Sequence, residues 1–173
     1  MHHLHLSIVL LTLSLVVGAC ANTPPAAPEP VSLHLIRQGQ QMLGGSRTLG
    51  GMWITDQGQL AELMSQVEQR AQLPSEPTPL PEVDFAEDGI LAVWMGEKPT
   101  GGFSLGLSGD QAEIEEQTAL VPVQWLEPEE GAVTPQVITN PYLIVRLGQG
   151  SYNRVSVVDQ NGVVRASLEV GEE

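Results

Sequence analysis

Residues 155–168 read VSVVDQNGVVRASL, and this stretch predicts a β-hairpin near the C-terminus. The pair Asn161-Gly162 is typical of a two-residue type I′ turn, in which both residues have a positive φ. A loop of that length sets the register of the two strands, so facing pairs alternate between an apolar and a polar side. The facing pairs are Val157 with Ala166, Val155 with Leu168, Ser156 with Ser167, and Val158 with Arg165.

Strand patterns also fill most of the chain between Phe85 and this hairpin. The run Ile90–Met95 consists of apolar residues only, which is typical of a strand buried on both faces. Three later segments alternate apolar with other residues, as half-buried strands do: 103–107, 121–125 and 143–147. Because proline cannot donate a hydrogen bond to a neighbouring strand, Pro122 places the second of them at a sheet edge or at a bulge.

One amphipathic helix is predicted over Asp56–Arg70. Asp56 followed by Gln59 resembles a capping box, and apolar residues recur at helical spacing: Leu60, Leu63, Met64 and Val67. Before the helix, Ser32–Ile36 and Met52–Ile54 are short strand candidates, and the glycines of 39–51 indicate a loop or an irregular hairpin. After it, the prolines between 74 and 81 indicate a connector.

These patterns together predict an α+β fold that is mostly β. We expect a single domain over residues 32–173, built from an antiparallel sheet of sandwich or roll type with one main helix near 56–70.

The first 19 residues are typical of a bacterial lipoprotein signal peptide. They contain no Asp, Glu, Lys or Arg, and their apolar run Ile8–Val17 is too short to span a bilayer core of about 30 Å. Gly18 and Ala19 stand directly before Cys20, and two small residues before a cysteine resemble a lipobox. We therefore expect residues 1–19 to be removed and Cys20 to carry palmitate-type acyl chains. The alternative is an ordinary cleaved signal peptide, with the cysteine there by chance.

Residues 20–31 would then join the lipid to the folded domain. Their prolines, at positions 24, 25, 28 and 30, favour an extended spacer of roughly 30 Å. Ala21 is not the acidic residue associated with retention in the inner membrane, so we expect the periplasmic side of the outer membrane. The N-terminal lipid is the only contact with the membrane that we expect.

The composition limits the partners of the protein. Its 173 residues carry 7 Lys and Arg against 21 Asp and Glu, a formal net charge of −14. Such an excess of negative charge repels phosphate and argues strongly against a nucleic-acid partner. The single Cys excludes an internal disulfide and any zinc or redox site of the CxxC type.

Few residues suit catalysis. Of the 4 His, only His34 lies outside the signal peptide, and it fits the polar face of a strand. Glu115-Glu116 and Glu129-Glu130 are carboxylate pairs, but neighbours on a strand point to opposite faces, so we expect these acids in solvent. No phosphate-binding or calcium-binding motif occurs. We expect no catalytic residue, no metal site and no cofactor.

One short segment, Gly96–Phe103, joins two of the predicted strands. It holds the only Lys of the protein, Lys98, followed by Pro99, which restricts φ. Gly101-Gly102 then allows backbone conformations that are closed to other residues. We expect the tip of a hairpin with a particular shape and a binding role; the alternative is an ordinary structural turn.

Several motifs resemble, in their order along the chain, the C-terminal domain of the PrcB family. They are Val83-Asp84-Phe85, Gly89–Met95, Gly96–Phe103 and Asn140–Val145, within about 83–147. That family is named for a lipoprotein accessory subunit of a bacterial surface protease complex. The resemblance implies a non-catalytic β domain that binds an extracytoplasmic protease or a similar protein partner and stabilises or assists its complex. The candidate partner-binding residues are Lys98, Pro99, Thr100, Gly101, Gly102, Phe103 and Tyr142.

Two other functions are alternatives. Lys98–Phe103 also resembles the N-P-T-T-G-aromatic loop of chagasin-type inhibitors of cysteine proteases, which block a cleft with three loops on a β-sandwich. Here Lys98 replaces the Asn and Gly101 the second Thr, and no convincing second or third loop is apparent. A carrier of a lipid or another small molecule is the remaining alternative, and it requires a large apolar cavity.

Overall fold

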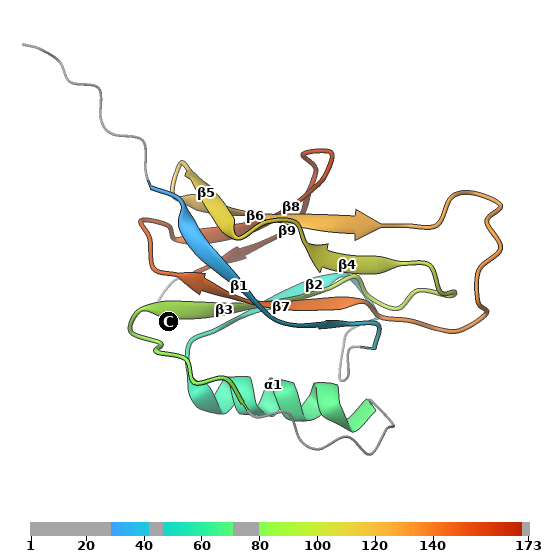
Figure 1. Ribbon diagram of the computed structural model, residues 1–173, viewed down its shortest axis with the longest axis horizontal. Helices are drawn as coiled ribbons and strands as arrows, with labels where there is room; N and C mark the ends of the chain where they lie inside the picture. The colour runs from blue at the N-terminus through green and yellow to red at the C-terminus, as the bar shows by residue number, and fades with distance from the viewer. Residues whose placement is uncertain (1–28, 42–46, 71–79, 171–173) are drawn as a thin grey trace, which may run out of the picture.

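A computed structural model of the protein describes residues 29–41, 47–70 and 80–170 (Figure 1). The predicted signal peptide 1–19, Cys20 and most of the predicted spacer 20–31 lie outside the described residues. The elements are β1 (Val31–Gly39), β2 (Gly50–Ile54), α1 (Gln57–Arg70), β3 (Asp88–Trp94), β4 (Ser104–Leu107), β5 (Gln111–Glu115), β6 (Thr118–Leu126), β7 (Tyr142–Gly148), β8 (Arg154–Asp159) and β9 (Val164–Glu169). No helix among these residues is long and apolar enough to cross a membrane.

The strands form one sheet in the order β2-β3-β7-β1-β5-β6-β8-β9, with β4 paired to β6. All pairs are antiparallel except β6 with β8. The sheet folds over into two layers, and Figure 1 shows β1 passing from the upper layer to the lower one above α1. The mostly β fold with an antiparallel sheet and one helix is therefore confirmed.

Two apolar cores hold these layers together, and β3 contributes to both. Leu91, Val93 and Met95 point into the core between the two layers. Ile90 and Ala92 point into the core between the lower layer and α1. The predicted burial of this strand on both faces is confirmed, since these five residues are at most 2% exposed.

Helix α1 covers the outer face of the lower layer. The carboxylate Oδ1 of Asp56 accepts a hydrogen bond from the N–H of Gln59 at 2.9 Å, which confirms the predicted N-cap. The four apolar residues of the predicted stripe are buried against the sheet: Leu60, Leu63, Met64 and Val67. Burying each of them fully stabilises the fold by about 1.5–3 kcal/mol.

Of the two expectations for Pro122, a sheet edge or a bulge, the sheet edge is wrong. Strand β6 lies inside the sheet, between β8 on one side and β5 and β4 on the other. The carbonyl of Pro122 accepts the N–H of Ser108 at 3.0 Å, in the connection between β4 and β5. Because N and C=O of a strand residue point to the same side, the missing N–H of Pro122 falls where one partner strand ends and the next begins.

The C-terminal hairpin has the predicted register but another turn. Three of the predicted facing pairs are present, namely Val155 with Leu168, Ser156 with Ser167, and Val157 with Ala166. The prediction of a type I′ turn is wrong. Of the pair Asn161-Gly162 only Gly162 has a positive φ, +77°. The N–H of Gly162 donates to the carbonyl of Asp159 at 2.9 Å, and the N–H of Asp159 donates to Val163 at 3.0 Å.

The loop therefore contains three residues, 160–162, and a bulge follows it. Val158 pairs with Val164 and not with Arg165 as predicted. The side chain of Asp159 explains this turn, because its Oδ1 accepts the N–H groups of Asn161 at 2.8 Å and Val163 at 3.0 Å. The turn was predicted from Asn161-Gly162 alone, which takes no account of the side chain of Asp159.

The bulge also directs Arg165 back toward the loop. Its Nε donates to Oδ2 of Asp159 at 2.8 Å, and its guanidinium lies 5.1 Å from the centroid of the Trp125 ring. Burial by itself would raise the pKa of Asp159. The hydrogen bonds from Val163 and Asn161 and the charge of Arg165 outweigh burial and hold the pKa below its ordinary value.

We predict that Asp159→Asn destabilises the protein in a pH-dependent way. Because the folded pKa is lowered, the stabilisation is present above the ordinary pKa of about 3.9 and is lost as the pH falls through the folded pKa. The urea midpoint of the variant should lie below that of the wild type at about pH 7, and the difference should shrink toward pH 3.

The matched control is Asp110→Asn, which changes an exposed carboxylate in the connection before β5. This control should leave the midpoint almost unchanged at both pH values. A difference between wild type and Asp159→Asn that stays constant with pH would contradict the role given to the carboxylate.

Candidate functional site: two loops at one end of the sheet

The segment after β3 is not the hairpin that its sequence predicts. Strand β3 pairs with β2 and β7, whereas β4 pairs only with β6. Residues 95–103 therefore cross from the lower layer to the upper one. The expectation fails because strand patterns show that two segments are strands but not which strands they pair with.

A second segment makes the same crossing in the opposite direction. Residues 127–141 leave β6 in the upper layer and enter β7 in the lower one. The start of each segment lies beside the end of the other. Trp94, before the first segment, pairs with Tyr142, after the second, and Ser104, after the first, pairs with Leu126, before the second. We call residues 95–103 and 127–141 the end-loop pair; it lies at the right-hand end of the molecule in Figure 1.

Hydrogen bonds join the two segments along their length. Lys98 and Thr139 exchange backbone bonds of 2.7 and 3.0 Å. The hydroxyl of Thr139 donates to the carbonyl of Thr100 at 3.0 Å, and the N–H of Gly101 donates to Pro135 at 2.8 Å. The end-loop pair therefore has a defined conformation, although its residues lie outside the main strands.

The glycines of this segment allow close approach. A Cβ on Gly101 would lie 3.2 Å from Cδ of Pro135, and Gly102 has a φ of +91°. At Gly96, which has a φ of +79°, a Cβ would lie 2.6 Å from the carbonyl carbon of Thr48. The backbone conformation therefore favours glycine at positions 96 and 102, and a side chain at position 101 would press against Pro135, whatever the segment binds.

The predicted binding residues of this segment differ in exposure. Pro99 and Gly102 are exposed, Lys98, Thr100 and Phe103 are partly buried, and Gly101 is buried. The Lys98 ammonium lies 5.3 Å from the centroid of the Phe103 ring, within the range of a cation–π contact. Phe103 in turn packs against the core between the layers.

Tyr142 does not belong to this surface. Its side chain is only 4% exposed and lies in the core between the lower layer and α1, on the other side of the sheet from Phe103. A Cβ on Gly39 would lie 2.7 Å from Cε1 of its ring. Burial raises the pKa of Tyr142, and Arg37 opposes this effect. The expectation of Tyr142 at the binding surface is therefore corrected, and the residue has a packing role.

Exposed apolar side chains of the end-loop pair were not predicted. Of the ten large exposed hydrophobic side chains in the described part of the chain, three belong to the end-loop pair: Val133, Val137 and Ile138. Val133 is fully exposed and Ile138 is 59% exposed. The signal for them in the sequence is weak, because they stand outside any alternating or helical pattern, between Pro128 and Pro141.

Acidic side chains stand on the same connection as these apolar ones. Glu127, Glu129 and Glu130 are exposed on the same loop, and the indole N–H of Trp125 donates to Glu127 at 2.9 Å. The prediction that Glu129-Glu130 is solvated is confirmed, as it is for Glu115-Glu116. An apolar patch with a charged rim is the usual composition of a protein-binding surface.

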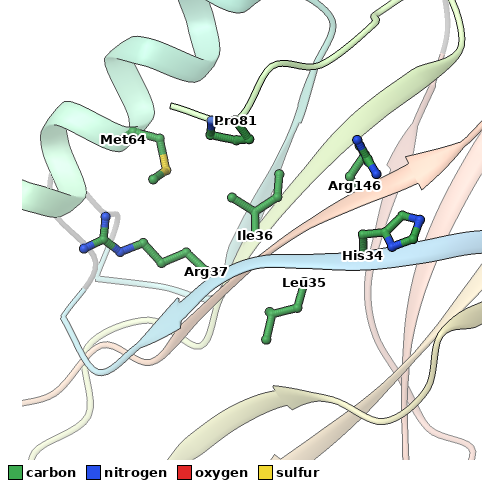
Figure 2. A pocket seen from close by; sticks show the side chains of 7 residues that line it. All are labelled: His34, Leu35, Ile36, Arg37, Met64, Pro81 and Arg146. Atoms are coloured by element: carbon green, nitrogen blue, oxygen red, sulfur yellow. The ribbon is translucent and has the colours of Figure 1, made fainter. Parts of the chain in front are cut away.

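A separate hollow of about 400 Å³ lies between β1 and α1 (Figure 2). Its cationic residues are each paired with an acid: Arg37 lies 3.3 Å from Glu68, and Arg146 lies 3.7 Å from Asp88. His34, exposed as predicted, borders the hollow. Within the described ranges no three His, Cys, Asp or Glu side chains come together as metal ligands.

Comparison with known proteins gives one informative match. The family model described as PrcB C-terminal matches residues 90–148. No curated protein and no solved structure matches the chain. The matched part begins within β3 and ends with β7, so it contains the whole end-loop pair but not α1. The resemblance of this protein to the PrcB C-terminal family, inferred from short motifs, is thus confirmed over residues 90–148.

Proposed function

We propose that this protein is a non-catalytic accessory protein that binds a protein partner through the end-loop pair. The observation that carries the proposal is the exposure of Val133, Val137 and Ile138 on loops whose backbone is held by hydrogen bonds. Covering these side chains would remove apolar surface from water. Because the loops are already ordered, little conformational entropy would be lost on binding.

The partner follows from the family resemblance. The PrcB family is named for an accessory subunit of a protease complex, so an extracytoplasmic protease or a component of its complex is the partner class that we propose. The exposed Glu127, Glu129 and Glu130 would favour a partner with basic residues around an apolar centre. This charge complementarity would affect mainly the rate of association and its dependence on salt.

The lipid anchor and its place in the cell envelope are part of the same proposal. An acylated Cys20 would hold the domain at the periplasmic side of the outer membrane, at the end of a spacer that reaches β1. Strand β1 begins at the left in Figure 1, whereas the end-loop pair lies at the right. An anchor attached there would leave the end-loop pair facing away from the membrane and open to a partner.

The two alternatives have weaker support. A chagasin-type inhibitor inserts a projecting loop into a cleft, whereas Lys98–Phe103 is bonded along its length to residues 135–139 and is partly buried. A lipid carrier needs an apolar cavity, whereas the space between the layers is filled by packed side chains of both layers.

We predict that Val133→Asp combined with Ile138→Asp weakens partner binding. Both side chains are exposed, so the fold should persist while the apolar patch acquires two charges that must be desolvated on binding. Affinity for the partner should fall by about tenfold or more, measured by chemical crosslinking in the native membrane followed by titration of the identified partner.

The matched control is Val164→Asp, which places the same charge at a 55% exposed valine on β9. It should bind like the wild type. Equal binding by wild type, control and double variant would refute the end-loop pair as the binding surface. Nanomolar inhibition of papain-like proteases by the wild type would instead favour the inhibitor.

We predict that Cys20→Ser releases the protein from the membrane. A serine cannot be acylated through a thioether, so the chain would lose the lipid that anchors it. The wild type should fractionate with the outer membrane, and the variant should appear in the soluble envelope fraction. Unchanged fractionation of the variant would contradict the lipid anchor, without bearing on the partner surface.

A further inference from the structure

A groove of about 590 Å³ lies between the second half of β1 and strand β4. It is lined by Gln38, Gly39, Gln40, Ser104, Leu105, Gly106, Leu107, Ser108, Gln124 and Leu126. None of these side chains is charged. The groove is a seam in the folded sheet, where two strands approach each other without pairing.

The pairing of the strands explains the seam. Strand β1 pairs with β5 only through Val31 and Ser32, and from Leu33 onward it pairs with β7 alone. Strand β4 pairs with β6 along one edge, and no described strand pairs with its other edge. The hydrogen bond of 2.8 Å from the N–H of Leu33 to Asp110 closes one end of the seam.

The free edge of β4 has its backbone groups directed into the groove. Ser108 donates its N–H to Pro122 of β6, so Gly106 and Ser104, which lie two and four residues earlier, also face β6. Leu105 and Leu107 therefore direct their N–H and C=O away from β6. A short strand edge with free donors and acceptors is able to accept a further strand.

An exposed apolar side chain lines the same groove. Leu126 is the last residue of β6, pairs with Ser104 of β4 and is 47% exposed. Leu35 of β1 is 48% exposed, and Figure 2 shows it pointing to the opposite side of β1 from Ile36 and Arg37, but it does not line the groove.

We propose that this seam binds an extended segment of a partner polypeptide, which adds to the free edge of β4 as a strand. The segment would pair with the backbone groups of Leu105 and Leu107 and would cover Leu126 with an apolar side chain. It would be uncharged where it contacts the groove, because the lining offers amides, hydroxyls and apolar groups only. Basic residues on either side of that stretch would favour its approach to a chain of net charge −14.

The charge also distinguishes this occupant from a second copy of the chain. Two copies would each bring a net charge of −14 and would repel each other, so self-association through the seam is disfavoured. The seam is separate from the patch of Val133, Val137 and Ile138, which does not line it. Strand addition at the seam therefore does not depend on the proposed function of the end-loop pair.

The test uses the full-length protein and a synthetic peptide with blocked ends, Ac-Lys-Thr-Val-Thr-Val-Thr-Lys-NH2. We expect saturable binding by NMR titration and slower hydrogen exchange of the Leu105 and Leu107 amides when the peptide is bound. A second peptide of the same sequence, N-methylated at alternate amides, keeps the side chains but cannot pair along one edge. It should bind about tenfold more weakly or not at all.

Two exposed positions give a matched pair of variants. Leu126→Lys places a charge in the lining of the groove that repels the basic peptide, and it should weaken binding by about tenfold or more. Met52→Lys adds the same charge at a 44% exposed residue of β2, outside the lining of the groove, and should bind like the wild type. The variant with Val133→Asp and Ile138→Asp should also bind the peptide normally, which separates this surface from the end-loop pair.

Several results would overturn strand addition at the seam. They are the absence of saturable binding, equal binding of the N-methylated peptide, and unchanged exchange of the Leu105 and Leu107 amides. Protection of these amides without any peptide would show that a second copy or another part of this chain fills the seam. Sedimentation would separate those two cases, and both contradict a partner segment.

Discussion

The architecture depends on the divided pairing of β1, which belongs to both layers of the sheet. Val31 and Ser32 pair with β5 above, and the strand then leaves this partner and continues along β7 below. A register shift lies between Leu35 and Arg37, within the pairing with β7, and an irregularity of this kind bends a strand. The sheet can therefore fold over on itself without a break in the chain, and an apolar core forms between its two halves.

Both surfaces that the structure offers to a partner follow from this arrangement. Because β1 leaves β5 early, the free edge of β4 remains uncovered and a seam opens beside it. Because β3 and β7 lie in the lower layer while β4 and β6 lie in the upper one, two connections must cross at the same end. These connections are not part of the regular strand pairing. Hydrogen bonds between them stabilise their conformation instead, as between Lys98 and Thr139.

Sequence patterns predict the local structure of this chain well. They predict poorly which segments lie next to one another in the folded protein. The cap of α1, the burial of β3 on both faces and most of the register of the C-terminal hairpin follow from spacing over a few residues. The hairpin expected at Gly96–Phe103 fails because the partner of β4 lies far along the chain. Tyr142 fails for a similar reason: the residues that bury it belong to α1 and β1, which no pattern around Tyr142 specifies.

The candidate site could be found from the sequence only in part, because its exposed side chains are of ordinary apolar residue types. Lys98, Pro99 and the two glycines stand out as residue types, and they do belong to the end-loop pair. Two of these positions, however, are explained by the backbone: Gly101 and Gly102 allow contact with Pro135, Pro128 and Thr134. The side chains open to a partner are instead ordinary apolar ones, Val133, Val137 and Ile138. Such residues are informative only by their exposure, and exposure is a property of the folded chain.

The strong negative charge would contribute differently to partner recognition at the two surfaces. At the end-loop pair, exposed glutamates stand on the same connection as the exposed apolar side chains and would select a partner by its basic residues. At the seam the lining is uncharged, so recognition would depend on backbone hydrogen bonds, which every polypeptide can make. A surface of that kind has little selectivity by itself. It becomes selective when a second surface on the same domain, with side-chain chemistry, chooses the partner and raises the local concentration of its extended segment. Under the two proposals, two separate surfaces on one sheet would therefore let the domain hold another chain at two places.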